Sequence, residues 1–195
     1  MTARRGHTVA NMLDHTGRLL VECTAIFFSI LLAFLVDEWR EDRRELREAD
    51  AALQLVRAEL QQNLDELEAI VPTRADTLEG YLAGLESLKS TGAFPNHLPE
   101  FLTPDITSIA YELATDSGAV TTVAAKELLV IAQAYAALEE VRRNDLFLTQ
   151  RNAQIRFNDG EQYLSGFVYY INRASANEPA AIDQVQKAIE TLDDT

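Results

Sequence analysis

Side chains able to bind a metal or act as nucleophiles are scarce in this chain of 195 residues. No two of its three histidines, His7, His15 and His97, are three or four positions apart, so no helix brings a pair to one face. A di-iron or zinc site is therefore not expected. The single cysteine, Cys23, lies in an apolar run that disfavours a thiolate. There is no Gly-rich phosphate loop and no nucleophile elbow, so we predict a non-enzymatic protein without catalytic residues, metal or cofactor.

One carboxylate, Glu22, stands within the apolar run and shares a helix face with Ala25, Ser29 and Ala33. Small residues at this spacing let two helices approach closely in lipid, which predicts a contact face for a protein partner or a second copy of the chain. The alternative is that Glu22 pairs with Arg18 at i,i+4 and extends to the lipid headgroups. The spacing leaves both interpretations open.

Aromatic residues gather near the C-terminal end, where Tyr163, Phe167 and Tyr170 recur at helical spacing. They form a possible pocket for a small ligand if the rings surround a cavity. The alternative is that they belong to the hydrophobic core, with their hydroxyl groups at the surface.

The apolar run that carries Glu22 covers residues 19–36, LLVECTAIFFSILLAFLV, between Arg18 and Asp37. A helix of this length spans roughly 27 Å, close to the bilayer core of about 30 Å. Trp39 and Arg40 follow at the position expected for the membrane interface, with Arg18 at the other end. A cleaved signal peptide is the rival interpretation, but no small-x-small cleavage site follows the run. We predict a retained, single-pass transmembrane helix.

This helix divides the chain into an N-terminal tail over residues 1–18, the transmembrane helix over 19–36, and a body over 37–195. Lys and Arg residues are nearly balanced on the two sides of the span, so the positive-inside rule indicates only weakly a cytoplasmic tail and a periplasmic body. The negative charge belongs to the body: residues 1–36 hold three Arg against Asp14 and Glu22, so the body carries -15 of a chain total of -14. Such an acidic surface argues against nucleic acid as a partner.

The body is predicted to be all-α, an antiparallel helical bundle. After the span no Gly or Pro occurs before Pro72, and leucines repeat every seven residues from Leu46 to Leu67. The membrane helix should therefore continue as a long amphipathic helix to about residue 70. A coiled-coil homodimer is one interpretation of the repeat, but the flanking charges do not pair across a parallel dimer, which favours an intramolecular bundle. Asn63, at a core position, needs a hydrogen-bond partner.

Helix start signals predict the remaining elements. Thr73 and Asp76 resemble a capping box, Thr103 followed by Pro104 predicts a short helix, and Glu178 with Pro179 predicts the start of the last one.

Two runs, VECTAIFFSILLAFLVDEW and SIAYELATDSGAVTTV, resemble a family of uncharacterised bacterial single-pass membrane proteins, classified as a domain of unknown function. The resemblance extends over roughly residues 18–140. It implies a location in the bacterial inner membrane and assigns no catalytic residues.

We therefore expect a membrane-anchored, non-enzymatic helical protein that acts through protein–protein contacts. The lipid bilayer and a protein partner or homo-oligomer, contacted through the transmembrane helix, are the expected partners. The alternative function is a periplasmic sensory or small-ligand-binding helical bundle.

Overall fold

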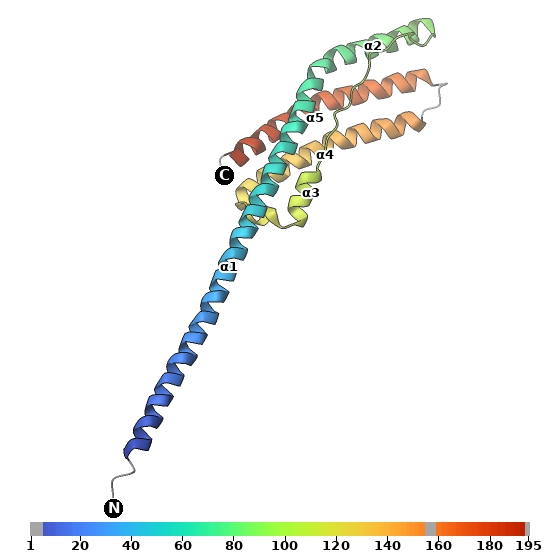
Figure 1. Ribbon diagram of the computed structural model, residues 1–195. Coiled ribbons are helices and arrows are strands. Elements are labelled where there is room, and N and C mark those ends of the chain that lie inside the picture. Colours follow the sequence, from blue (N-terminus) through green and yellow to red (C-terminus); the bar gives the residue numbers. More distant parts are fainter. Residues whose placement is uncertain (1–5, 155–158, 194–195) are drawn as a thin grey trace, which may run out of the picture. The chain divides into compact units, whose positions relative to one another are not determined.

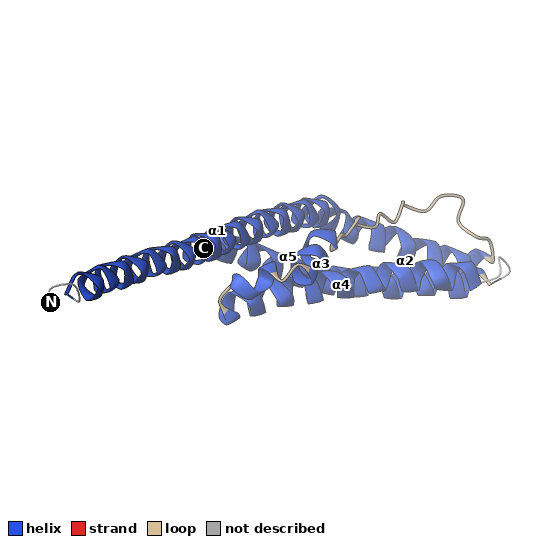
Figure 2. Ribbon diagram, turned by 60° about the horizontal axis from the view of Figure 1, so that its bottom comes forward, coloured by secondary structure: helices blue, strands red, loops and turns tan. Residues whose placement is uncertain are grey.

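The computed structural model describes residues 6–154 and 159–193, with side chains described from Glu22 onward except at 122, 149 and 151–158. Within these ranges the chain is helical and contains no strand, which confirms the all-α class (Figures 1 and 2). The α-helices are α1 (Gly6–Ile70), α2 (Arg74–Thr91), α3 (Ile109–Asp116), α4 (Ala125–Gln154) and α5 (Gly160–Asp193), with 3₁₀ turns η1 (Val71–Thr73) and η2 (Ala119–Thr122).

The chain divides into two units, Met1–Glu48 and Ala49–Thr195. In the part of the chain that the structure describes, no helix has an apolar stretch of the length and hydropathy that crossing a membrane requires. The span predicted over residues 19–36 begins at positions 19–21, whose side chains lie outside the described set.

The C-terminal part of α1 belongs to the second unit and contributes one face to its core. The prediction that this helix is unbroken to about residue 70 is confirmed. Along its heptad repeat Val56, Leu60, Asn63 and Leu67 are buried, and the three apolar residues pack with residues of α3, η2, α4 and α5. From Ala49 to Ile70 this face is thus covered within the chain, as the intramolecular bundle requires, whereas Leu46 at the start of the repeat is 56% exposed.

Helices α2, α4 and α5 are the other long helices of the second unit, and α5 packs against both α2 and α4. Helices α2 and α5 are antiparallel, because Arg74 contacts Glu178 while Tyr81, later in α2, stacks on Phe167, earlier in α5. Figure 1 likewise shows α4 and α5 side by side and antiparallel. A second cluster of buried apolar residues lies between α2, α4 and α5: Tyr81, Leu148, Leu164, Phe167, Tyr170 and Ile171.

The helix predicted to begin at Thr103 begins instead at Ile109, so this start was wrong. Asn63 explains the difference. Its Oδ1 accepts from the Thr107 N–H at 3.0 Å and its Nδ2 donates to the Thr107 carbonyl at 2.8 Å. Because both backbone groups of Thr107 are engaged by α1, the segment before Ile109 is held outside the helix, as part of the loop that leads from α2 to α3 (Figure 2).

The N–H groups of the first turn of α3, which have no partner within the helix, are capped from α1 rather than by a local side chain. Glu59 accepts from the Ala110 N–H at 2.8 Å and from the Tyr111 N–H at 3.3 Å, and Ser108 at the N-cap makes no capping bond. The hydroxyl of Tyr135 also donates to Glu59, at 2.7 Å. The pKa of Tyr135 is raised, mainly by burial and further by the Glu59 carboxylate. The phenol therefore stays protonated.

Two other helix boundaries differ from the predictions. Thr73 is the N-cap of α2, but its hydroxyl donates back to the Ile70 carbonyl at 2.8 Å, so the predicted capping box does not form. Pro179 lies inside α5 instead of opening a new helix. Ala174 and Ala181, on either side of it, are buried, and this packing offsets the backbone hydrogen bond that proline cannot make.

Candidate functional site

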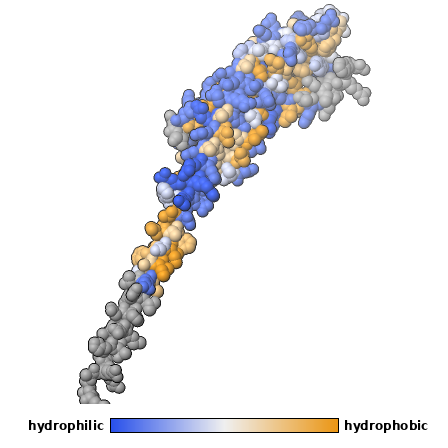
Figure 3. Space-filling model, viewed as in Figure 1, coloured by the Kyte–Doolittle hydropathy of each residue, from blue (hydrophilic) through white to orange (hydrophobic). Residues whose placement is uncertain are grey.

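The first unit presents a segment of α1 that is apolar on all sides. Every large apolar side chain from Ile26 to Val36 is exposed, by fractions between 43% and 68%. We call residues 26–36 the apolar segment; Figure 3 shows it as an orange band below a blue, hydrophilic stretch. A helix that is hydrophobic all round is normally buried in a protein core or in a membrane. This segment is therefore a surface suited to contact with an apolar environment.

The predicted contact face, Glu22, Ala25, Ser29 and Ala33, lies along this part of α1, and all four side chains are exposed. Ser29 Oγ donates to the Ala25 carbonyl one turn earlier, at 2.8 Å. The hydroxyl is therefore satisfied inside its own helix and leaves a small, nonpolar surface at this position. Cys23 is also exposed.

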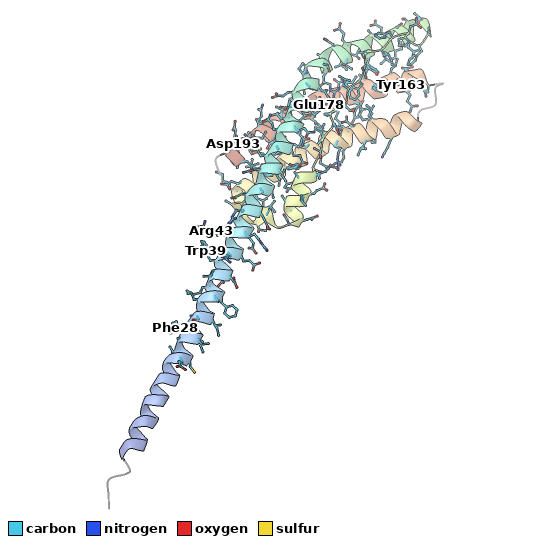
Figure 4. All side chains as sticks on the ribbon, viewed as in Figure 1. Phe28, Trp39, Arg43, Tyr163, Glu178 and Asp193 are labelled. Atoms are coloured by element: carbon cyan, nitrogen blue, oxygen red, sulfur yellow. The ribbon has the colours of Figure 1, made fainter. Side chains whose placement is uncertain are left out.

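The C-terminal border of the apolar segment carries an aromatic–cation pair that was not predicted. The guanidinium of Arg43 lies over the Trp39 ring, 4.9 Å from its centroid (Figure 4). The i,i+4 spacing of these two residues was the available sequence signal. Trp39 and Arg40 are both exposed. The side chain of Arg18, predicted for the opposite interface, lies outside the described residues.

Beyond this border, charged pairs line the helix surface. Arg44 lies 3.4 Å from Glu41 and 3.5 Å from Glu48, with side chains about two-thirds exposed. Such exposed pairs contribute at most about 1 kcal/mol each to stability. The apolar segment thus ends abruptly at a charged, well-hydrated stretch of the same helix.

The aromatic residues predicted as a possible pocket lie in the second unit and pack into its core. Phe167 and Tyr170 are buried and Tyr163 is half-buried. The Phe167 ring lies 4.7 Å from Tyr81 and 4.9 Å from Tyr163, measured between centroids. Burial raises the pKa of Tyr81 to about 12. This ring packing is what the core interpretation of these residues predicts.

The ion pair between Arg74 and Glu178, both fully buried in the second unit, was missed from the sequence. Arg74 also donates from Nη1 to the Leu102 carbonyl at 2.7 Å, and its guanidinium lies over Phe101. Both charges also act on the carboxyl of Asp145 in α4, where burial raises the pKa, Arg74 lowers it and Glu178 raises it. The partners come from four separate segments, so no local pattern marks them.

Within the described residues, no three His, Cys, Asp or Glu side chains lie close enough to hold a metal ion. No protein-family model, curated protein or solved structure matches the chain.

Proposed function

We propose that the chain is a membrane-anchored helical protein that acts through protein–protein contacts, with residues 19–36 as a single-pass anchor in the bacterial inner membrane. The exposed apolar segment is the observation that carries this proposal. Leaving it in water exposes contiguous apolar surface, and burial in lipid removes that penalty at about 25 cal/mol for each Å² covered.

The border of the apolar segment supports the same proposal. Trp39 with the Arg43 guanidinium above its ring combines an apolar body and a cationic head. Side chains of this kind favour the level of the lipid headgroups. The charged pairs around Arg44 then lie on the aqueous side of that level.

Membrane extraction tests the anchor. Arginine near the centre of a bilayer costs about 2.5–3.5 kcal/mol, so a double variant Phe28→Arg, Leu32→Arg should be released from bacterial membranes by alkaline carbonate. Leu129→Arg is the matched control, because Leu129 is 58% exposed but lies on α4 in the second unit. The wild type and the control should stay in the membrane pellet. Release of the wild type by carbonate would contradict the anchor.

The protein contact is proposed to use the small-residue face of Ala25, Ser29 and Ala33. A photo-crosslinking amino acid at Ala33 should form a protein adduct in intact membranes, whether with a second copy or with another protein. The same group at Leu31 lies about 160° away around the helix and should label lipid. Equal protein adducts from both positions, or none from either, would contradict this contact face.

A reporter fused after Thr195 tests the proposed periplasmic side of the body. An enzyme active only in the periplasm should be active in this fusion, and a reporter active only in the cytoplasm should be silent. The opposite pattern would reverse the orientation and leave the anchor unaffected.

A further inference from the structure

A groove between α4 and α5 carries features that the proposed function does not use. It has a volume of about 550 Å³, within the range of small-molecule sites. It lies in the second unit, and its lining combines charged, amide and aromatic groups. The lining residues are Glu140, Arg143, Asn144, Leu146, Phe147, Gln150, Tyr169 and Arg173.

One lining residue, Asn144, is 6% exposed, and its Nδ2 has no hydrogen-bond partner among the described residues. A buried donor without a partner costs about 1–3 kcal/mol, and an apolar side chain of similar size would avoid that penalty. An amide at this position therefore lowers stability unless something else accepts from it.

A second buried polar group belongs to Tyr170, which lies behind the lining of the groove. The hydroxyl of Tyr170 also has no partner in the described part of the chain, and this residue is 2% exposed. Its ring contacts two lining residues, Phe147 at 5.4 Å and Tyr169 at 5.5 Å between centroids. The Tyr170 hydroxyl can donate or accept, but the amide Nδ2 of Asn144 can only donate, so the group missing beside Asn144 is an acceptor.

The charged residues of the groove also favour an acceptor. Arg143 lies 3.7 Å from Glu140 and 3.6 Å from Glu139, and Arg173 pairs with Glu140. Because each guanidinium has five N–H donors, these two carboxylates leave some of the donors available. Two arginines with one acid make the groove locally cationic on a chain whose net charge is -14.

Apolar surface completes the groove. Leu146, Phe147 and Tyr169 are between 51% and 56% exposed. Large apolar side chains exposed next to one another commonly mark a binding surface. They suit a ligand whose apolar part lies beside its anionic group.

We propose that this groove binds a small organic carboxylate with an aromatic or aliphatic body. The carboxylate is held by the guanidinium groups of Arg143 and Arg173 with the Asn144 amide, and the apolar body packs on Phe147 and Tyr169. The site is distinct from the Tyr163 and Phe167 rings, which pack in the core, and it does not depend on membrane anchoring.

The test uses the full chain in phosphatidylcholine nanodiscs, with empty nanodiscs as the reference, and 3-phenylpropionate as the probe in a ligand-observed NMR titration. Saturable binding is expected in the micromolar to millimolar range. 3-Phenylpropylamine has the same ring and a cationic end, so its binding should be at least about tenfold weaker. Undetectable binding of the acid at millimolar concentration, or equal binding of acid and amine, would overturn the proposal.

Two variants test the assigned residues. Asn144→Leu should abolish binding and raise the melting temperature, because it removes the unpartnered donor. Arg173→Gln should weaken binding at least about tenfold, a loss that corresponds to about 1.4 kcal/mol. Lys187→Gln, on the exposed surface of the same helix, is the control and should bind as the wild type does. If Asn144→Leu and Arg173→Gln both bind as the wild type does, the groove is not the site.

Discussion

The guanidinium of Arg74 and the carboxylate of Glu178 form a buried ion pair across 104 positions of sequence, in which Arg74 Nε donates to Glu178 Oε2 at 2.8 Å. The same guanidinium lies 4.4 Å from the centroid of the Phe101 ring and donates to the Leu102 carbonyl. One cation thus joins the start of α2, the middle of α5 and the loop that follows α2. Figure 4 labels Glu178 within the bundle.

Removing one charge of this pair should destabilise the bundle strongly. Glu178→Gln keeps the shape of the side chain but leaves the Arg74 cation uncompensated, and we expect a loss of about 3–5 kcal/mol in the free energy of unfolding. Denaturation followed by circular dichroism measures it. The double variant Arg74→Met, Glu178→Leu should be much closer to the wild type, since it buries no charge. A double variant less stable than the single one would contradict this account.

Asp145 should make the stability of the bundle depend on pH. Burial, opposed by Arg74 and assisted by Glu178, raises the pKa of its carboxyl to about 6 from an ordinary value of 3.8. Between these values the folded chain binds more protons than the unfolded chain at this site. This contribution to stability is therefore complete below about pH 4 and is lost as the pH rises through about 6.

Asp145→Asn removes that dependence. The melting temperature of the variant minus that of the wild type should increase between about pH 4 and about pH 7, because only the wild type loses this contribution over that range. Asp183→Asn, at an exposed position of α5, is the control for the loss of one negative charge. A constant difference between Asp145→Asn and the wild type would show that the carboxyl titrates normally.

Asn63 should hold the loop before α3 through its two bonds to Thr107. Asn63→Leu leaves a backbone N–H and a carbonyl without these partners, and we expect a loss of about 1–3 kcal/mol in stability. Amide hydrogen exchange at Thr107 should become faster. Gln61→Ala changes an exposed amide of the same helix that donates to Asp65, and it should leave this exchange unchanged. Equal protection of Thr107 in both variants would rule out the assigned role of Asn63.

Trp39 is the only tryptophan, so its fluorescence reports on one border of the proposed anchor. Its emission should shift to shorter wavelength when the protein is inserted into liposomes, and bromine atoms near the headgroups should quench it more than bromine at the chain ends. The variant Trp39→Phe, Phe94→Trp moves the probe to an exposed loop position of the second unit and should show neither effect. Stronger quenching of Trp39 from the chain ends would place it deeper than the interface.

Residue spacing in the sequence was sufficient to predict features that depend on a single helix. The run without Gly or Pro before Pro72 predicted a helix to about residue 70, and Ile70 is its last residue. The heptad face was predicted as the buried face, and Val56, Leu60 and Leu67 are buried. These features follow from spacing along one helix, which is present in the sequence itself. The run of exposed apolar residues in α1 is likewise a property of composition alone.

Where a local sequence signal competes with groups from distant parts of the chain, the tertiary structure determined the outcome. Thr103 and Pro104 are favourable for a helix start, yet α3 begins at Ile109 because Asn63 and Glu59 of α1 engage the backbone around that start. Pro179 remains within a helix because the residues around it are packed. The buried pair of Arg74 and Glu178 and the groove containing Asn144 join residues from different helices. Burial and unpartnered donors arise only when those helices pack, so no spacing in the sequence could have marked them.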